Sequence, residues 1–134
     1  MRPLLIHGPA EAAIAAEAAL TIGDTVHVIS EPGAGGNGGP GWFLALIAAA
    51  TAQYPGAKLT GILDCADQPG AVMASLRAGC THLIFTGPND TTQRLAEMAQ
   101  ASGAVLLTAR PEALSLRGRR DALPYALNWL RISL

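Results

Sequence analysis

Three side chains in the sequence have the chemistry of general acids and bases: His7, Glu31 and Asp64. An imidazole beside a carboxylate can take up and release a proton near neutral pH, or contribute ligands to a metal ion. Each of the three ends or follows a short apolar run, so each is expected where a strand gives way to a loop. Asp64 is the strongest candidate, because a carboxylate at the end of an apolar strand requires a partner or water. The alternative for His7 is a structural hydrogen bond to a loop carbonyl.

A glycine-rich segment, SEPGAGGNGGPGWF at 30–43, separates a strand-like run from an alanine-rich run. Gly33, Gly35 and Gly38 form the pattern G-x-G-x-x-G, which between a strand and a helix is typical of dinucleotide binding. The match is incomplete, because a Glu-Pro pair intervenes before the first glycine and a proline starts the helix after the third. The P-loop pattern fails, since no Gly-Lys-Ser/Thr follows. We therefore interpret the segment as a mobile loop whose backbone N–H groups can receive an anion.

This segment supplies most of the candidate ligand contacts. Trp42 stands at the start of the expected helix, where it is either a core anchor or a ring that stacks on a ligand. Asn89 and Arg110 follow later strands, and Arg110 offers a guanidinium to an anion. The candidate ligand-binding residues are Gly33, Gly35, Gly36, Gly38, Gly39, Trp42, Asn89 and Arg110.

The two cysteines, Cys65 and Cys80, form neither a CxxC pair nor a Cys/His spacing that suits zinc. We expect buried free thiols in a reducing cytoplasm rather than nucleophiles. No metal site and no cofactor is predicted. The basic cluster RGRR at 117–120 is interpreted as a solvated turn.

The composition narrows the classes of partner. Only 14% of the residues are charged, against about 25% in a typical domain, and the net charge is -1. Nothing in this balance attracts nucleic acid or an anionic membrane. No apolar run is long enough to span a bilayer, and the N-terminus lacks a signal-peptide pattern, so a cytoplasmic protein is expected. A chain this apolar is expected to bury a further face in a homo-oligomer or under a protein partner.

Short apolar runs alternate with alanine-rich segments along the chain, which predicts βαβ units and a parallel sheet. A length of 134 residues predicts a single domain over 1–134. The class is α/β, a doubly wound fold with a five-stranded sheet, and residues 112–134 form a C-terminal helical tail. The expected strands are 3–8, 25–30, 58–65, 81–87 and 104–109, and the expected helices are 9–21, 40–54, 68–79, 89–103 and one from Asp121.

The expected topology gathers the candidate residues at one edge. In open parallel sheets, ligands bind at the carboxyl ends of the strands. His7, Glu31, Asp64 and Arg110 all come at such ends, and Asn89 or Asp90 caps a helix there. We therefore expect these side chains to share one rim, while Lys58, the only lysine, starts a strand at the opposite rim.

The stretches SLRAGCTHLIFTGP and TVHVISEPG resemble the second half and the central strand of a response-regulator receiver domain. The resemblance covers about Asp24 to Gln100 and implies a flavodoxin-like scaffold. The family's functional residues are absent: its phosphorylated Asp falls near Val28, its switch Thr or Ser on Asp64, and its lysine on Gly87. The acid pair after the first strand is missing, as are the second strand and its helix, and an extra strand follows. Segments also resemble phosphate-binding (β/α) barrels, so a half-barrel is the alternative fold.

Two functions follow from these patterns. The first is a non-phosphorylatable receiver-like module with a regulatory or protein-binding role. Such a module would bind a second copy of itself or a protein partner through one of its surfaces. The second is a protein or enzyme that binds a small anion such as a nucleotide or phosphosugar at the carboxyl ends of the strands. In that case the glycine segment would hold the anion, and His7, Glu31 and Asp64 would supply acid/base groups. The sequence leaves open whether the chain is an enzyme.

Overall fold

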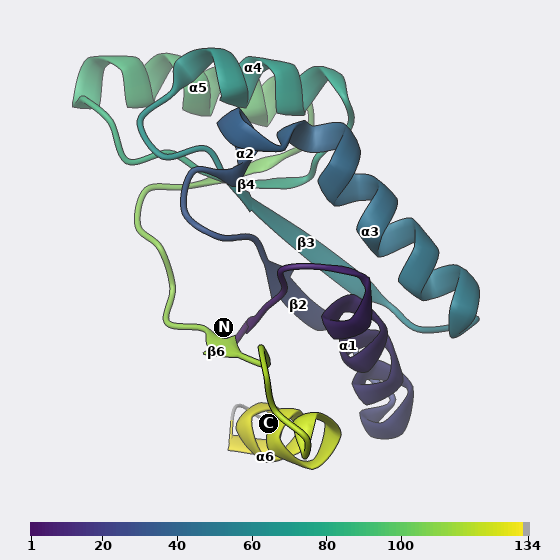
Figure 1. Cartoon of the computed structure of the whole chain (residues 1–134). Helices are drawn as coiled ribbons and strands as arrows, with labels where there is room; N and C mark the ends of the chain where they lie inside the picture. Colours follow the sequence, from purple (N-terminus) through teal and green to yellow (C-terminus); the bar gives the residue numbers. More distant parts are fainter. Residues whose placement is uncertain (133–134) are drawn as a thin grey trace. The chain divides into compact units, whose positions relative to one another are not determined.

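The computed structural model describes residues 1–132, and within them strands and helices alternate as expected for the α/β class (Figure 1). Six strands are ordered β5-β4-β3-β2-β1-β6, and every pair with a defined register is parallel. The strands are β1 Leu4–Leu5, β2 Val26–Ile29, β3 Leu59–Asp64, β4 His82–Ile84, β5 Val105–Leu107 and β6 Leu114–Ser115. The helices are α1 Pro9–Ile22, α2 Ala34–Asn37, α3 Gly39–Gln53, α4 Pro69–Arg77, α5 Asn89–Ala101 and α6 Ala122–Ile132.

The chain divides into two compact units, and α3 and β3 contribute residues to both. The first unit contains residues 1–29, 45–60 and the chain from Pro111 onward. In it β1 lies between β2 and β6, with Leu4 opposite both Val28 and Leu114. Helix α1 contacts β2 and α6 through a face of alanines, whose small side chains permit close approach. It ends at Gly23, which adopts the left-handed conformation that favours glycine (φ 70°).

The second unit contains Ser30–Leu44 and Gly61–Arg110. Here β4 lies between β3 and β5, with Leu83 opposite Leu63 and Leu106. Buried side chains of β3 and β4 form its core together with Leu95 and Ala99 of α5, whereas Val105 of β5 is exposed. Helix α4 contacts α2 and α5, and α5 contacts β5. This unit therefore positions the carboxyl end of β3, where Asp64 lies.

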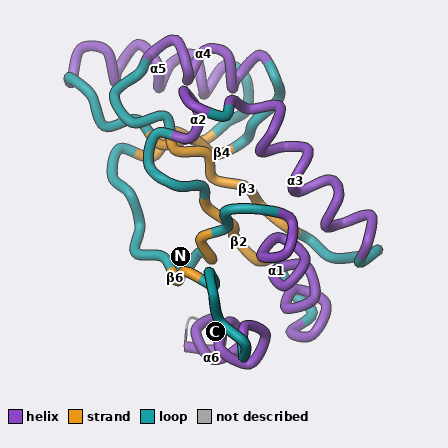
Figure 2. Tube along the Cα trace, in the orientation of Figure 1, coloured by secondary structure: helices purple, strands orange, loops and turns teal. Residues whose placement is uncertain are grey.

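Three sequence predictions about elements require correction. The prediction of five strands missed β6, which lies in the segment assigned to a helical tail; a two-residue strand is too short to produce a periodic signal. The glycine-rich segment is not an open loop, because it contains helix α2 (Figure 2). Asn89 does not cap α5: the N-cap is Pro88, and Asn89 is the first helical residue.

None of the helices within residues 1–132 is long and apolar enough to cross a membrane.

Candidate functional site

Asp64 lies at the carboxyl end of β3 with only 4% of its surface exposed, and three donors bind its carboxylate. The Arg110 guanidinium donates to Oδ2 at 2.9 Å, and the backbone N–H groups of Ala66 and Gly33 donate to Oδ1 at 2.8 and 3.3 Å. A buried carboxylate is stable when it is both paired with a cation and hydrogen-bonded. The partner that the sequence required for Asp64 is thus supplied by the chain itself.

Arg110 connects three segments that are distant in the sequence. Besides its ion pair with Asp64, its Nη2 donates to the backbone carbonyl of Ser30 at 2.8 Å. It therefore joins the segment after β5 to the ends of β2 and β3, with a quarter of its side chain exposed. The sequence predicted an anionic ligand for Arg110, and in the structure the anion that it contacts is Asp64.

Ser30 completes this network, although no catalytic or ligand-binding role was predicted for it. It is fully buried, and its Oγ accepts a hydrogen bond from the Asp64 N–H at 3.0 Å. The same hydroxyl donates to the Glu31 carbonyl, also at 3.0 Å. The only sequence signal was a serine at the end of a β-branched strand, where a hydroxyl can bind backbone groups.

Several backbone N–H groups of the glycine-rich segment donate hydrogen bonds to oxygen atoms of the chain itself. The Gly33 N–H binds Asp64, while the N–H groups of Gly36 and Gly38 donate to the carbonyls of Gly33 and Ala34. These three N–H groups, which were expected to be available to an anion, are therefore engaged within the chain. The physical reason is that the segment folds into a helical turn, which directs successive N–H groups back onto its own carbonyls.

Two of the glycines have a structural explanation. Gly33 has a positive φ of 76°, which side chains rarely adopt. A Cβ on Gly35 would lie 2.8 Å from the Cys65 Sγ and 3.2 Å from the Asp64 carbonyl oxygen. Glycine at 35 therefore lets α2 approach the end of β3 closely, which side chains of any size would prevent.

Trp42 is a surface residue, and the core anchor at the start of α3 is its neighbour Phe43. Phe43 is buried, whereas 41% of Trp42 is exposed, so the expectation of Trp42 as a core anchor is wrong. The indole borders an open pocket of about 290 Å³. The other residues that line this pocket are Glu31, Pro32, Ala34, Asn37 and Gly38.

His7 follows β1 in the first unit and contacts a carboxylate that the sequence reasoning overlooked. Its ring Nδ1 lies 3.1 and 3.2 Å from the Oε1 and Oε2 atoms of Glu11, and Oε1 also accepts a hydrogen bond from the His7 backbone N–H. The signal was present, because Glu11 is four residues from His7 in the first turn of the expected α1. Glu31 and Asp64, the carboxylates expected beside His7, belong to the second unit.

The thiols are poor nucleophiles. Both cysteines are buried and free. Burial raises the pKa of Cys65 to about 11, although a hydrogen bond with the Ser75 hydroxyl lowers it by a smaller amount. Burial also raises the pKa of Cys80. Both are therefore protonated near neutral pH, and only the thiolate is reactive. Within residues 1–132 no group of three or more metal-ligating side chains is assembled.

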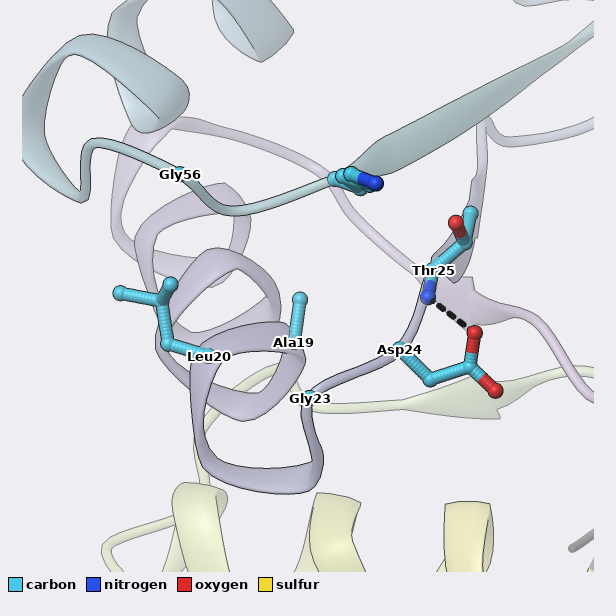
Figure 3. A pocket seen from close by; sticks show the side chains of 7 residues that line it. Ala19, Leu20, Gly23, Asp24, Thr25 and Gly56 are labelled. Atoms are coloured by element: carbon cyan, nitrogen blue, oxygen red, sulfur yellow. Dashed lines mark hydrogen bonds between the residues drawn. The ribbon is translucent and has the colours of Figure 1, made fainter.

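A further pocket lies at the amino ends of β2 and β3, in the first unit (Figure 3). It has a volume of about 190 Å³, and Lys58 lines it, as expected for a residue at the rim opposite the carboxyl ends. The Asp24 carboxylate beside it accepts a hydrogen bond from the Thr25 N–H at 2.7 Å. None of the acid/base candidates from the sequence lies in this pocket.

No protein-family model matches the sequence, and no curated protein is similar enough to indicate a relationship.

Proposed function

We propose that the chain is a regulatory or protein-interaction module on a receiver-like scaffold, and that it acts by presenting the surface around Trp42 to a second copy of itself. The strand order supports the scaffold. Flavodoxin-like sheets have the order 2-1-3-4-5. If β1 to β4 correspond to the family's first, third, fourth and fifth strands, β6 occupies the place of the missing second strand beside β1. A half-barrel, whose strands follow chain order, would not place β6 there.

The positions that carry phosphotransfer in the receiver family support a module without that chemistry. Val28, where the phosphorylated Asp would fall, is a fully buried apolar residue. At Gly87, where the lysine would fall, a Cβ would lie 2.4 Å from the Phe85 ring, so a longer side chain would displace that ring. Asp64, at the switch position, is held by Arg110. These positions are therefore suited to structure rather than to phosphoryl transfer.

The observation that carries the interaction function is the exposure of Trp42 beside a pocket. Exposed tryptophans are enriched at the centres of protein interfaces, because a large rigid ring buries much area at little entropic cost. The polar groups at the end of β3 bind one another, whereas the indole faces solvent. The low charge fraction of the chain agrees with a further buried face.

An anionic-ligand site at the same segment has weaker support. The N–H groups of Gly33, Gly36 and Gly38 already bind oxygens of the chain, and Glu31 lines the pocket beside Trp42. Thermal-shift measurements with nucleotides and phosphosugars separate the two functions. A module of the proposed kind shows no stabilisation by these ligands. We assign it to the reducing cytoplasm because its two cysteines are free thiols.

Sedimentation velocity over a range of protein concentrations tests the proposal. The wild-type chain is expected to form a dimer, and Trp42→Ala to shift the equilibrium strongly toward monomer. Met98→Ala is the matched control, since Met98 is equally exposed, at 41%, on another helix of the same unit. A wild-type chain that stays monomeric at every concentration, or equal dissociation by both variants, would show that this surface does not have the proposed function.

A further inference from the structure

A second pocket lies in the first unit, between the amino-terminal turns of α1 and α6 and the turn that follows β6. Its volume is about 400 Å³. Its apolar lining includes the buried Leu116 and the half-buried side chains of Ile14 and Leu123. A ligand here would therefore place an apolar body against aliphatic side chains.

Charged groups surround this apolar interior, and all but one have a partner. Arg119 forms two hydrogen bonds of 3.0 Å with the Asp121 carboxylate, and its guanidinium lies 3.4 Å from the centre of the Tyr125 ring. The Glu11 carboxylate contacts His7. Arg120 also lines the pocket, but its side chain makes no hydrogen bond or ion pair with another residue of 1–132. The pocket thus combines aliphatic walls with one uncompensated guanidinium.

We propose that this pocket binds a small monocarboxylate with an apolar body, such as a medium-chain aliphatic acid. The guanidinium of Arg120 presents paired N–H donors that match a carboxylate in geometry and charge. Ile14, Leu116 and Leu123 contact the hydrocarbon part. A phosphate ester is less suitable, because a single free arginine would face a dianion while the Glu11 carboxylate also lines the pocket. The site belongs to the first unit and is independent of the Trp42 surface.

NMR titration of the ¹⁵N-labelled full chain with octanoate tests this site. Saturable shifts are expected at Ile14 and over 116–124, with dissociation in the millimolar range or tighter. Octylamine has the same tail with the opposite charge, and acetate has the charge without the tail; both are expected to bind much more weakly. Absence of octanoate shifts in these residues, or equal binding of octylamine, would overturn the proposal.

Two charge-matched variants identify the group that recognises the carboxylate. Arg120→Gln keeps most of the side-chain length and is expected to weaken octanoate binding about tenfold, the effect of losing one charge-assisted hydrogen-bonding partner. Arg131→Gln removes the same charge from α6 outside the pocket and is expected to leave the affinity unchanged. The spectra report whether each variant is folded. Unchanged affinity in Arg120→Gln, or equal loss in both variants, would refute the role of Arg120.

Discussion

Arg110 and Arg120 are two arginines in opposite situations. Arg110 pairs with a buried carboxylate and a backbone carbonyl at the ends of β2 and β3. Arg120 lines a pocket and has no ion pair among the residues that the structure describes. Burial removes water from a charge and forces the fold to supply a partner, whereas an exposed charge is solvated and stays free to bind a ligand. Arg110 therefore stabilises the structure, and Arg120 is the better candidate for recognition.

The largest expected effect is the loss of Arg110. Arg110→Gln leaves the buried Asp64 carboxylate without its cation, and the free energy of unfolding is expected to fall by about 3 kcal/mol or more. Urea denaturation of the variant and the wild type measures this change in the free energy of unfolding. Arg94→Gln serves as the control, because Arg94 lies on the solvent-exposed face of α5. If the free energy of unfolding falls by less than about 0.5 kcal/mol in Arg110→Gln, the ion pair with Asp64 does not stabilise the fold.

The next effect tests the close approach of α2 to β3. Gly35→Ala places a Cβ within 2.8 Å of the Cys65 Sγ and is expected to destabilise the chain by about 2 kcal/mol. Adding Cys65→Ala should recover part of this loss, since it removes the sulfur. Gly41→Ala is the control, because nothing lies within 4 Å of a Cβ there and the residue is inside α3. If both alanines are tolerated equally, the packing explanation for Gly35 is wrong.

A third prediction concerns alkaline pH. The pKa of Cys65 is raised from 9.0 to about 11 by burial, so folding favours the protonated thiol. Its contribution to stability is complete below pH 9 and declines as the pH rises toward 11. Near pH 10 the decline is expected to reach about 1 kcal/mol. Urea denaturation of wild type and Cys65→Ala over this range gives the difference, and parallel pH profiles would contradict the buried protonated thiol.

The smallest expected effect completes the comparison of the two arginines. Arg120→Gln is expected to change the free energy of unfolding by less than about 0.5 kcal/mol, because its guanidinium makes no hydrogen bond or ion pair with another residue of 1–132. The measurement is the same urea denaturation as for Arg110→Gln. A loss near that of Arg110→Gln would mean that Arg120 has a structural role after all.

Much of the α/β pattern could be read from the sequence because it depends on local periodicity. Each predicted strand overlaps one of β1 to β5, and the helices begin near Pro9, Pro69 and Asn89 as expected. Helix α2 and strand β6 were not predicted, because the same local periodicity is absent from them. Each is too short to show a period, and three of the four residues of α2 are glycine or asparagine, which have low helix propensity.

Among the candidate residues, the structure brings Asp64, Arg110 and Gly33 into contact, while His7 contacts Glu11 instead. The sequence indicated that Asp64 needed a partner, and it placed Arg110 at the same edge. It could not show that these two would bind each other, because 46 residues separate them. Their pairing depends on the path of the backbone between β3 and the end of β5.

By itself, the sequence determined the α/β class of the fold, since that class depends on which side chains are present and in what order. Only the tertiary structure decided which charges have partners. It engaged the N–H groups of Gly36 and Gly38 in the turn of α2, paired Asp64 with Arg110, and left Trp42 exposed beside a pocket. The physical reason is that hydrogen bonds and burial depend on distances in space, and these arise only when strands from distant parts of the chain lie side by side.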